Sequence, residues 1–205
     1  MTCSPLDMTR SNPFCTRRVR PGAMTYRFAG DEGMAALLAT LAANRFRGEI
    51  VGPHGSGKST LLASLAAALE ADGLAVCRFT LTAGDRSLSA GWRATTAAAN
   101  VVLVDGYEQL AWWARLALRR FCRASGLVIT SHRGAGLPRL VSTAPSADLS
   151  WRLVQALYGA AQPLVGREEV EAAFARHSGN LREVFFELYD LDEERAYAQD
   201  VSRTQ

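Results

Sequence analysis

A glycine-rich loop between a short apolar segment and a helix-forming segment is the strongest constraint on how this chain can fold. Residues 52–59 read G-P-H-G-S-G-K-S and match the pattern G-x-x-x-x-G-K-[ST] at every defined position. Residues 48–51 are typical of a short buried strand, and residues 60–70 of a helix that ends at Asp72-Gly73. A strand, a glycine-rich loop and a helix N-terminus in this order are typical of a phosphate-binding loop.

The residue types of this loop suit a bound anion. Glycines allow successive backbone N–H groups to point inward, and the dipole of the following helix adds positive potential at the same place. The Lys58 ammonium, expected to face solvent without ligand, would reach the β- and γ-phosphates of a nucleotide, and the Ser59 hydroxyl would bind Mg²⁺. The predicted phosphate-binding residues are Gly52, Pro53, His54, Gly55, Ser56, Gly57, Lys58, Ser59 and Thr60.

Length and composition set the broad class of the protein. The 205 residues suffice for one α/β domain and a small appendage, and the contents of 48% hydrophobic and 21% charged residues are ordinary for a globular protein. A net charge of +3 is too mild to indicate nucleic-acid binding by itself. The four cysteines have no metal-binding spacing, and no apolar run predicts a membrane span or secretory signal, so we expect a cytoplasmic protein with reduced thiols.

Apolar runs along the chain predict further strands that alternate with helices. Strands are expected at 74–81, 101–105, 126–131 and 137–143, and helices at about 31–44, 92–99 and 107–123. This alternation predicts a parallel sheet with helices on both faces. The remaining segments, at about 147–160, 167–177 and 180–197, are all helical. We therefore predict an irregular segment over residues 1–25, a P-loop core over 26–145 and a small C-terminal helical lid over 146–198.

Two carboxylates follow the apolar run of residues 101–104. Asp105 ends this predicted strand, where a carboxylate near the phosphate loop suits Mg²⁺, although a turn aspartate beside Gly106 is the structural alternative. Glu108 would polarise or position a water for attack on the γ-phosphate, and its alternative is a first-turn glutamate favoured by the helix dipole.

A second group of polar residues lies at the end of the strand predicted at 126–131. We expect this strand to lie between the phosphate-loop strand and the strand that ends in Asp105, so its last residues would face the γ-phosphate and the attacking water. The sequence does not decide which of them points inward, and a solvated strand end is the alternative. The candidates are Thr130, Ser131, His132 and Arg133, with Ser131 and His132 named as catalytic candidates.

These motifs give the chain a resemblance to AAA+ ATPases, and more narrowly to the NACHT (STAND) branch. Residues 101–108, V-V-L-V-D-G-Y-E, look like the NACHT-type second motif, and 128–133, V-I-T-S-H-R, are similar to a sensor strand ending in T-S-R. Residues 178–183, S-G-N-L-R-E, resemble the start of the last lid helix. The resemblance covers about residues 25–190. It implies ATP as the nucleotide, and it implies that Arg182 approaches the γ-phosphate from the lid.

The departures from this family pattern concern catalysis. The acid that usually follows the Asp105 position in AAA+ proteins is replaced by Gly106, and Gln109 stands where NACHT proteins often carry a second acid. Hydrolysis is therefore expected to be slow. For Arg182, the alternative is an exposed side chain paired with Glu183 or Glu187.

The sequence therefore predicts a Mg²⁺-dependent ATPase that cleaves the β–γ phosphate bond to drive or switch a partner interaction. The catalytic candidates are Lys58, Glu108, Ser131, His132 and Arg182, and the metal ligands are Ser59 and Asp105. One alternative is a small-molecule kinase whose acceptor pocket would use Asp85, Arg86 and Arg93 in the loop 82–96. The other is a nucleotide-dependent switch that does not hydrolyse ATP.

The predicted helix 107–123 also offers a partner surface. Its apolar face is predicted to contain Leu110, Trp113, Ala114, Ala117 and Phe121. Its opposite face would present Trp112, Arg115, Arg119 and Arg123 to a protein or nucleic-acid partner, or simply to solvent.

Overall fold

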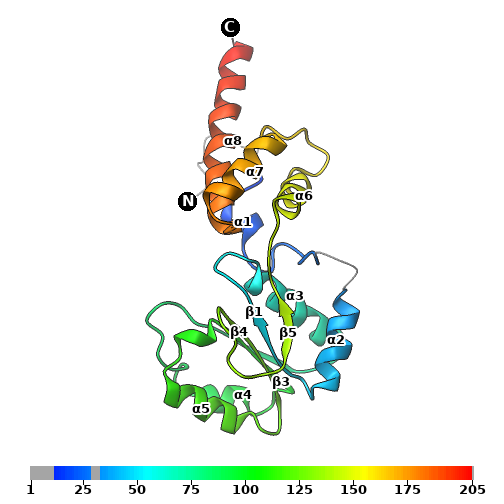
Figure 1. Cartoon of the computed structure of the whole chain (residues 1–205), viewed down its shortest axis with the longest axis vertical. Coiled ribbons are helices and arrows are strands. Elements are labelled where there is room, and N and C mark those ends of the chain that lie inside the picture. Colours follow the sequence, from blue (N-terminus) through cyan, green and yellow to red (C-terminus); the bar gives the residue numbers. More distant parts are fainter. Residues whose placement is uncertain (1–11, 29–32, 205) are drawn as a thin grey trace. The chain divides into compact units, whose positions relative to one another are not determined.

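The computed structural model describes residues 12–28 and 33–204, which form two compact units (Figure 1). The sheet unit contains residues 25–53 and 58–143. The helical unit contains, among the described residues, 12–24, 54–57 and 144–204. Each unit has its own cluster of buried apolar side chains.

Among the described residues, the sheet unit holds one parallel sheet in the order β2-β3-β4-β1-β5. Its strands are β1 (Arg47–Val51), β2 (Val76–Thr80), β3 (Val101–Asp105), β4 (Gly126–Ser131) and β5 (Arg139–Ser142). The order confirms the prediction that β4 lies between the phosphate-loop strand and the strand ending in Asp105. Because all strands are parallel, the carboxyl ends of β1, β3 and β4 meet at one edge of the sheet.

Helices cover both faces of this sheet, as the fully apolar strands require. Successive residues of a strand point to opposite faces, so Val101 and Leu103 pack on one side of β3, and Val102 and Val104 on the other. The first side is covered by α2 (Met34–Ala43) and α3 (Lys58–Ala71), and the second by η1 (Tyr107–Gln109) and α5 (Trp112–Phe121) (Figure 1). A short helix, α4 (Trp92–Thr96), precedes β3.

The predicted continuous helix over 107–123 was wrong. Leu110 and Ala111 have extended backbone, with ψ values of 137° and 153°, and they separate η1 from α5. This break changes the rotational phase of α5, so that its buried residues are Ala114 and Leu118. Trp113, which was assigned to the apolar face, is 52% exposed, and Phe121 is 37% exposed.

The helical unit confirms the prediction of a helical C-terminal region. It consists of α6 (Ala147–Tyr158), α7 (Arg167–Arg176), α8 (Leu181–Thr204) and the short α1 (Thr16–Val19). Figure 1 shows α8 running past α6 and α7. Its buried core includes Leu153, Val154, Leu157, Val170, Val184 and Leu188.

The N-terminal segment contributes to this core, although the sequence predicted only an irregular segment there. Phe14 is 1% exposed, and its ring centroid lies 5.8 Å from that of Tyr158 and 6.1 Å from that of Phe185. Asn12 is also buried and donates a hydrogen bond to the Tyr189 carbonyl at 3.0 Å. Residues 1–11 of the predicted segment, and residues 31–32 of the predicted helix 31–44, lie outside the described residues.

Two features bear on the expected class of protein. No helix among the described residues is both long enough and apolar enough to cross a membrane. Cys15, Cys77 and Cys122 are buried free thiols, and Cys3 lies outside the described residues. Burial raises the pKa of the Cys77 and Cys122 thiols, which disfavours the thiolate form that a nucleophile would need.

Phe14→Ala is expected to lower the free energy of unfolding by about 3–5 kcal/mol, because it removes a fully buried aromatic side chain. Tyr197→Ala is the matched control in the same unit, since Tyr197 is 74% exposed. Urea denaturation followed by circular dichroism measures both. Equal stability of the Phe14 variant and the parent would mean that the N-terminal segment is not part of the helical core.

Candidate active site

The predicted phosphate-binding loop connects β1 to α3 in the order that the sequence predicts. Lys58 and Ser59 form the first residues of α3, so the backbone N–H groups of the loop lie at a helix N-terminus. Gly55 and Gly57 have positive φ values of 67° and 90°. Side chains rarely tolerate this region, so the backbone path itself favours glycine at Gly57, which the motif defines, and at Gly55, which stands at a variable position of the motif.

Lys58 folds back onto its own loop. Its Nζ lies 2.8 Å from the Gly52 carbonyl oxygen, 2.6 Å from the Pro53 carbonyl oxygen and 3.3 Å from His132 Nδ1. The three N–H bonds of an ammonium suffice for these three acceptors. The expectation that Lys58 faces solvent without ligand was wrong, because the residue is only 8% exposed. A phosphate would have to compete with the loop carbonyls for this cation.

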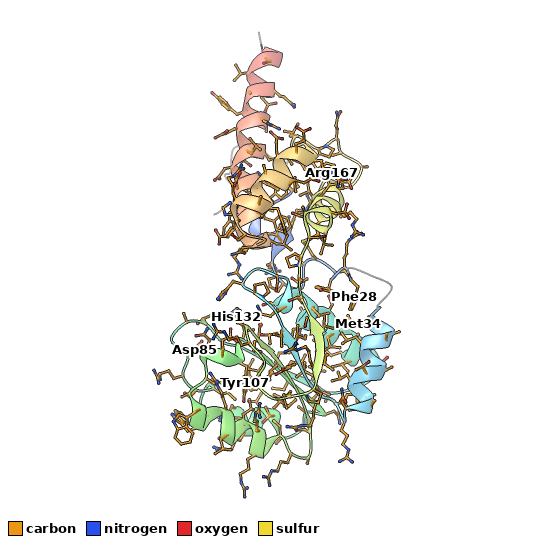
Figure 2. The ribbon with its side chains drawn as sticks, viewed as in Figure 1. Phe28, Met34, Asp85, Tyr107, His132 and Arg167 are labelled. Atoms are coloured by element: carbon orange, nitrogen blue, oxygen red, sulfur yellow. The ribbon has the colours of Figure 1, made fainter. Side chains whose placement is uncertain are left out.

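His132 links Lys58 to the candidate general base. Its Nε2 lies 2.8 Å from Glu108 Oε1, and its Nδ1 faces Lys58 Nζ at 3.3 Å. Nδ1 also lies 3.2 Å from the Gly52 carbonyl oxygen, so an unprotonated Nδ1 accepts from Lys58, whereas a protonated one donates to Gly52. An Nε2–H donates to Glu108. Figure 2 labels His132, which follows β4.

Asp105 is held by the neighbouring strand. Its Oδ1 accepts a hydrogen bond from Thr130 Oγ1 at 2.6 Å, and the same hydroxyl accepts from the Gly106 N–H at 2.8 Å. Thr130 is 1% exposed. Its role was left open by the sequence, and the geometry now shows that it fixes the orientation of the carboxylate. Asp105 Oδ2 has no hydrogen bond with the described residues and is a hard oxygen ligand of the kind that Mg²⁺ prefers.

The backbone at Gly106 explains why the usual acid is missing there. Gly106 has a φ of 75°, and a Cβ at this position would lie 2.6 Å from the Leu81 carbonyl oxygen. A glutamate would therefore combine a strained backbone with a steric overlap. The next carboxylate along the chain is Glu108, on η1.

Glu108 has one unused oxygen. Oε1 is bound to His132, while Oε2 is buried and has no hydrogen-bond partner among the described residues. Buried carboxylate oxygens are rarely left without a donor, and a water is the usual solution. Arg115 anchors the backbone here, because its guanidinium donates to the Glu108 carbonyl oxygen at 2.6 Å.

Ser131 and Arg133, the other residues that follow the Asp105-bound threonine, have different surroundings. Ser131 Oγ donates to the Arg133 carbonyl oxygen at 2.7 Å and is buried, so in this arrangement it closes the turn after β4. The Arg133 side chain is exposed. Of the two predicted catalytic candidates after β4, His132 is therefore the one that reaches the other site residues.

In the helical unit, the segment before α8 packs on a residue of the phosphate loop. The Leu181 N–H donates to the Gly55 carbonyl oxygen at 3.2 Å, and a Cβ on Gly55 would overlap Asn180 Oδ1. Asn180 Oδ1 accepts from the Arg182 N–H at 3.2 Å and so caps α8 at the helix start that the sequence predicts for residues 178–183.

The carboxylate pairing considered for Arg182 is absent from the part of the chain that the structure describes. Glu187 pairs instead with Arg176 and with His177, whose Nε2 lies 2.8 Å from Glu187 Oε2. The Arg176 guanidinium, together with His177, lowers the pKa of the Glu187 carboxyl. Arg182 is exposed and joins no ion pair with the described residues.

Two of the three residues proposed for a kinase acceptor pocket, Asp85 and Arg93, are engaged locally. Asp85 Oδ2 accepts from the Thr82 N–H at 2.7 Å and from the Thr82 hydroxyl at 2.9 Å, and these bonds lower the pKa of the Asp85 carboxyl. The Arg93 guanidinium stacks over the Trp92 ring at 4.8 Å. Both contacts are made within residues 82–96 and give no indication of a pocket for a phosphate acceptor.

The predicted partner surface on α5 requires a correction. Arg115 donates to the Leu110 carbonyl oxygen at 2.7 Å, and Arg119 donates to the Tyr107 hydroxyl at 3.0 Å and to the Ala135 carbonyl. Both arginines turn inward over Tyr107, which Figure 2 labels, instead of facing a partner. Trp112, 76% exposed, and Arg123 remain on the surface.

Comparison with known structures identifies proteins of the same fold. A DNA replication initiation factor matches with a TM-score of 0.61 and 12% identity over 83% of this chain and 62% of that chain. DnaA from Aquifex aeolicus with bound AMPPCP matches with a TM-score of 0.54 and 13% identity over 77% and 61%. The replication initiator DnaA bound to AMPPCP and single-stranded DNA matches with a TM-score of 0.55 and 16% identity over 78% and 61%.

These similarities concern the fold alone. No protein-family model and no curated protein sequence matches the chain. The chain spans about three fifths of the length of each of the three structures. The narrower resemblance to the NACHT branch stays a prediction, because the matched structures are replication initiators.

Proposed function

We propose that this chain, which has the parallel P-loop fold of AAA+ ATPase domains, binds Mg²⁺–ATP and hydrolyses its β–γ bond slowly. The observation that carries the proposal is the linked set of Lys58, His132 and Glu108, with a buried, unpartnered Glu108 oxygen. AMPPCP, an ATP analogue, is bound in two of the similar structures, which favours an adenine nucleotide.

In this proposal the loop residues 52–60 bind the phosphates. Lys58 exchanges the Gly52 and Pro53 carbonyls for phosphate oxygens, and the backbone N–H groups at the start of α3 contribute further donors. Ser59 and Asp105 are the proposed Mg²⁺ ligands, since both offer hard oxygens and Thr130 already orients the carboxylate. When bound, Mg²⁺ supplies neutralisation of the charge on the phosphates.

Glu108 is the proposed residue for the attacking water. Its free Oε2 accepts a proton from the water while the water oxygen forms a bond to the γ-phosphorus, and the bond from that phosphorus to the β–γ bridging oxygen breaks. His132 holds Oε1 and thereby positions the carboxylate. Because Lys58 and the Gly52 carbonyl both contact Nδ1 of the same imidazole, nucleotide binding changes the hydrogen bonds of His132 and hence of Glu108.

The runner-up is a nucleotide-dependent switch without hydrolysis. Glu108 is the sole acid proposed for the water, because Gly106 cannot be replaced by the usual glutamate without strain. A Glu108 carboxylate that does not reach the attacking water would leave nucleotide binding without hydrolysis. In either case the partner is a protein or a nucleic acid, and the free thiols favour a cytoplasmic protein.

Lys58→Ala is expected to weaken ATP binding by roughly tenfold to a hundredfold, as for the loss of charged hydrogen bonds worth about 1.5–3 kcal/mol. Isothermal titration calorimetry with Mg²⁺–ATP measures the affinity, and circular dichroism checks that the fold is kept. Arg120→Ala, on the exposed side of α5, is the matched control and should bind as the parent does. Equal affinity of the Lys58 variant and the parent contradicts nucleotide binding by this loop.

Glu108→Gln is expected to bind ATP as tightly as the parent but to turn it over roughly a hundredfold more slowly, because an amide cannot accept the proton of the water. Asp105→Asn should instead reduce the dependence of ATP binding on Mg²⁺. Phosphate release by purified protein and calorimetry with and without Mg²⁺ separate the two effects. If Glu108→Gln hydrolyses ATP at the parent rate, Glu108 has only a structural role. If the parent protein itself does not hydrolyse ATP, the nucleotide-dependent switch is the better proposal.

Arg182→Ala is expected to remove most of the preference for ATP over ADP while the melting temperature stays the same, because its exposed side chain joins no ion pair with the described residues. Arg176→Ala is the matched control, since it breaks the pair with Glu187 and should alter stability more than nucleotide preference. Calorimetry with both nucleotides gives the ratio. An unchanged ratio in the Arg182 variant would end the proposed contact with the γ-phosphate.

A further inference from the structure

A groove at the amino edge of the sheet is lined by arginines and by no carboxylate. Its volume is about 650 Å³, which is within the range of small-molecule sites. The side chains that matter are Arg45, Phe46, Arg47, Leu74, Asn100 and Arg123. These residues precede or begin the strands, whereas Lys58, Asp105 and Glu108 follow strand ends. A five-residue strand spans about 16 Å, so the groove is separate from the candidate active site.

The arginine at the rim of this groove has a strained backbone. Arg45 and Phe46 have consecutive positive φ values of 55° and 57°, a region that is uncommon for residues other than glycine. The turn is held in place, because Phe46 N–H donates to the Leu41 carbonyl at 2.8 Å and a Cβ on Gly126 would lie 2.5 Å from Phe46 Cβ. An arginine at position 45 therefore stands on a fixed backbone turn at a cost in backbone strain, and such outliers concentrate at functional sites.

Only one of the three arginines in this groove is bound to the end of a helix. Arg47 donates to the carbonyl oxygens of Cys122 and Ser125, at 2.5 Å and 3.4 Å, and so compensates the C-terminal end of α5. Arg45 and Arg123 make no side-chain hydrogen bond or ion pair with the described residues, and both are exposed. Two guanidinium groups therefore remain available to a ligand.

A neutral donor completes the lining. Asn100 Oδ1 accepts from the Ala75 N–H at 2.7 Å, which fixes the amide and leaves its NH₂ group to donate. Phe46 and Leu74 add apolar surface beside these polar groups. The lining therefore combines two guanidinium groups, an amide donor and an apolar wall.

We propose that this groove binds a phosphate group of a ligand, with Arg45 and Arg123 as its charged contacts and Asn100 as a neutral donor. Guanidinium groups present parallel N–H donors that match phosphate oxygens, and they keep their charge at all physiological pH values. Phe46 and Leu74 contact the part of the ligand that carries the phosphate. The phosphate belongs either to a small phosphorylated molecule or to a nucleic-acid backbone.

The test uses the full chain carrying Lys58→Ala, which weakens phosphate binding by the phosphate loop. Inorganic pyrophosphate is the probe, and its affinity is measured by calorimetry. Arg45→Gly should weaken pyrophosphate binding by about tenfold while the melting temperature stays the same or rises, because glycine relieves the positive φ. A loss of affinity in a variant that is at least as stable cannot come from unfolding. Arg123→Gln should also lose about tenfold, and Arg120→Gln, on α5 but outside the groove, should bind as the parent does.

Fluorescence anisotropy of a labelled oligothymidylate, with pyrophosphate as competitor, separates the two sources of phosphate. Oligonucleotide binding that is displaced by pyrophosphate and weakened in Arg45→Gly supports a nucleic-acid backbone. Pyrophosphate binding without oligonucleotide binding supports a small phosphorylated molecule. The proposal is overturned if neither probe binds, if Arg45→Gly and Arg123→Gln bind as the parent does, or if Arg120→Gln loses as much affinity as they do.

Discussion

Because β3 and β4 are buried on both faces of the sheet, polar side chains occur only where these strands end. Asp105 and Thr130 are those first polar residues, and they meet through a hydrogen bond of 2.6 Å. Parallel pairing brings both ends to the edge from which the phosphate loop departs. The chemistry of the candidate site is therefore a consequence of where the apolar core stops. A polar residue one position earlier in β3 would point into a core and would lack a partner.

The same packing moves the acid proposed for catalysis along the chain. The turn after Asp105 passes so close to the Leu81 carbonyl that only glycine fits at position 106. The acid proposed for catalysis then comes from η1, where Arg115 holds the backbone and His132 holds Oε1. A carboxylate held by a histidine that also contacts Lys58 responds to whatever Lys58 binds. The close approach of this turn to the Leu81 carbonyl thus explains two features. Glycine replaces the usual acid at position 106, and the proposed acid is instead Glu108, which His132 links to Lys58.

The sequence predicts the parts of this molecule that depend on local pattern. The central strands, the loop between β1 and α3, and the Asn180 cap all follow from apolar periods and residue type. The break between η1 and α5 does not, because it depends on two extended residues, Leu110 and Ala111, that carry no glycine or proline signal. This break moves Trp113 and Phe121 out of the predicted apolar face, whereas Ala114 stays buried.

Contacts between residues far apart in sequence could not be predicted from local residue patterns either. Phe14 packs on Tyr158 and Phe185 although its neighbours in the chain show neither a helical nor a strand period. Thr130 holds Asp105 across 25 positions of sequence, and a strand end of four polar residues gives no indication of which one does so. Arg119 extends to the Tyr107 hydroxyl because its long apolar stem lets the charge turn inward, which a face assignment by periodicity does not consider.

The two edges of the sheet differ in how they can hold an anion. In a parallel sheet each connecting helix begins near the carboxyl edge, so backbone N–H groups and helix dipoles already favour phosphate there, as at the start of α3. At the amino edge the helices end, and their carbonyl groups oppose an anion. Binding there has to come from side-chain charge, and Arg47 is largely committed to the end of α5. The two remaining arginines, one of them held in a strained turn, are what an anion site at this edge requires.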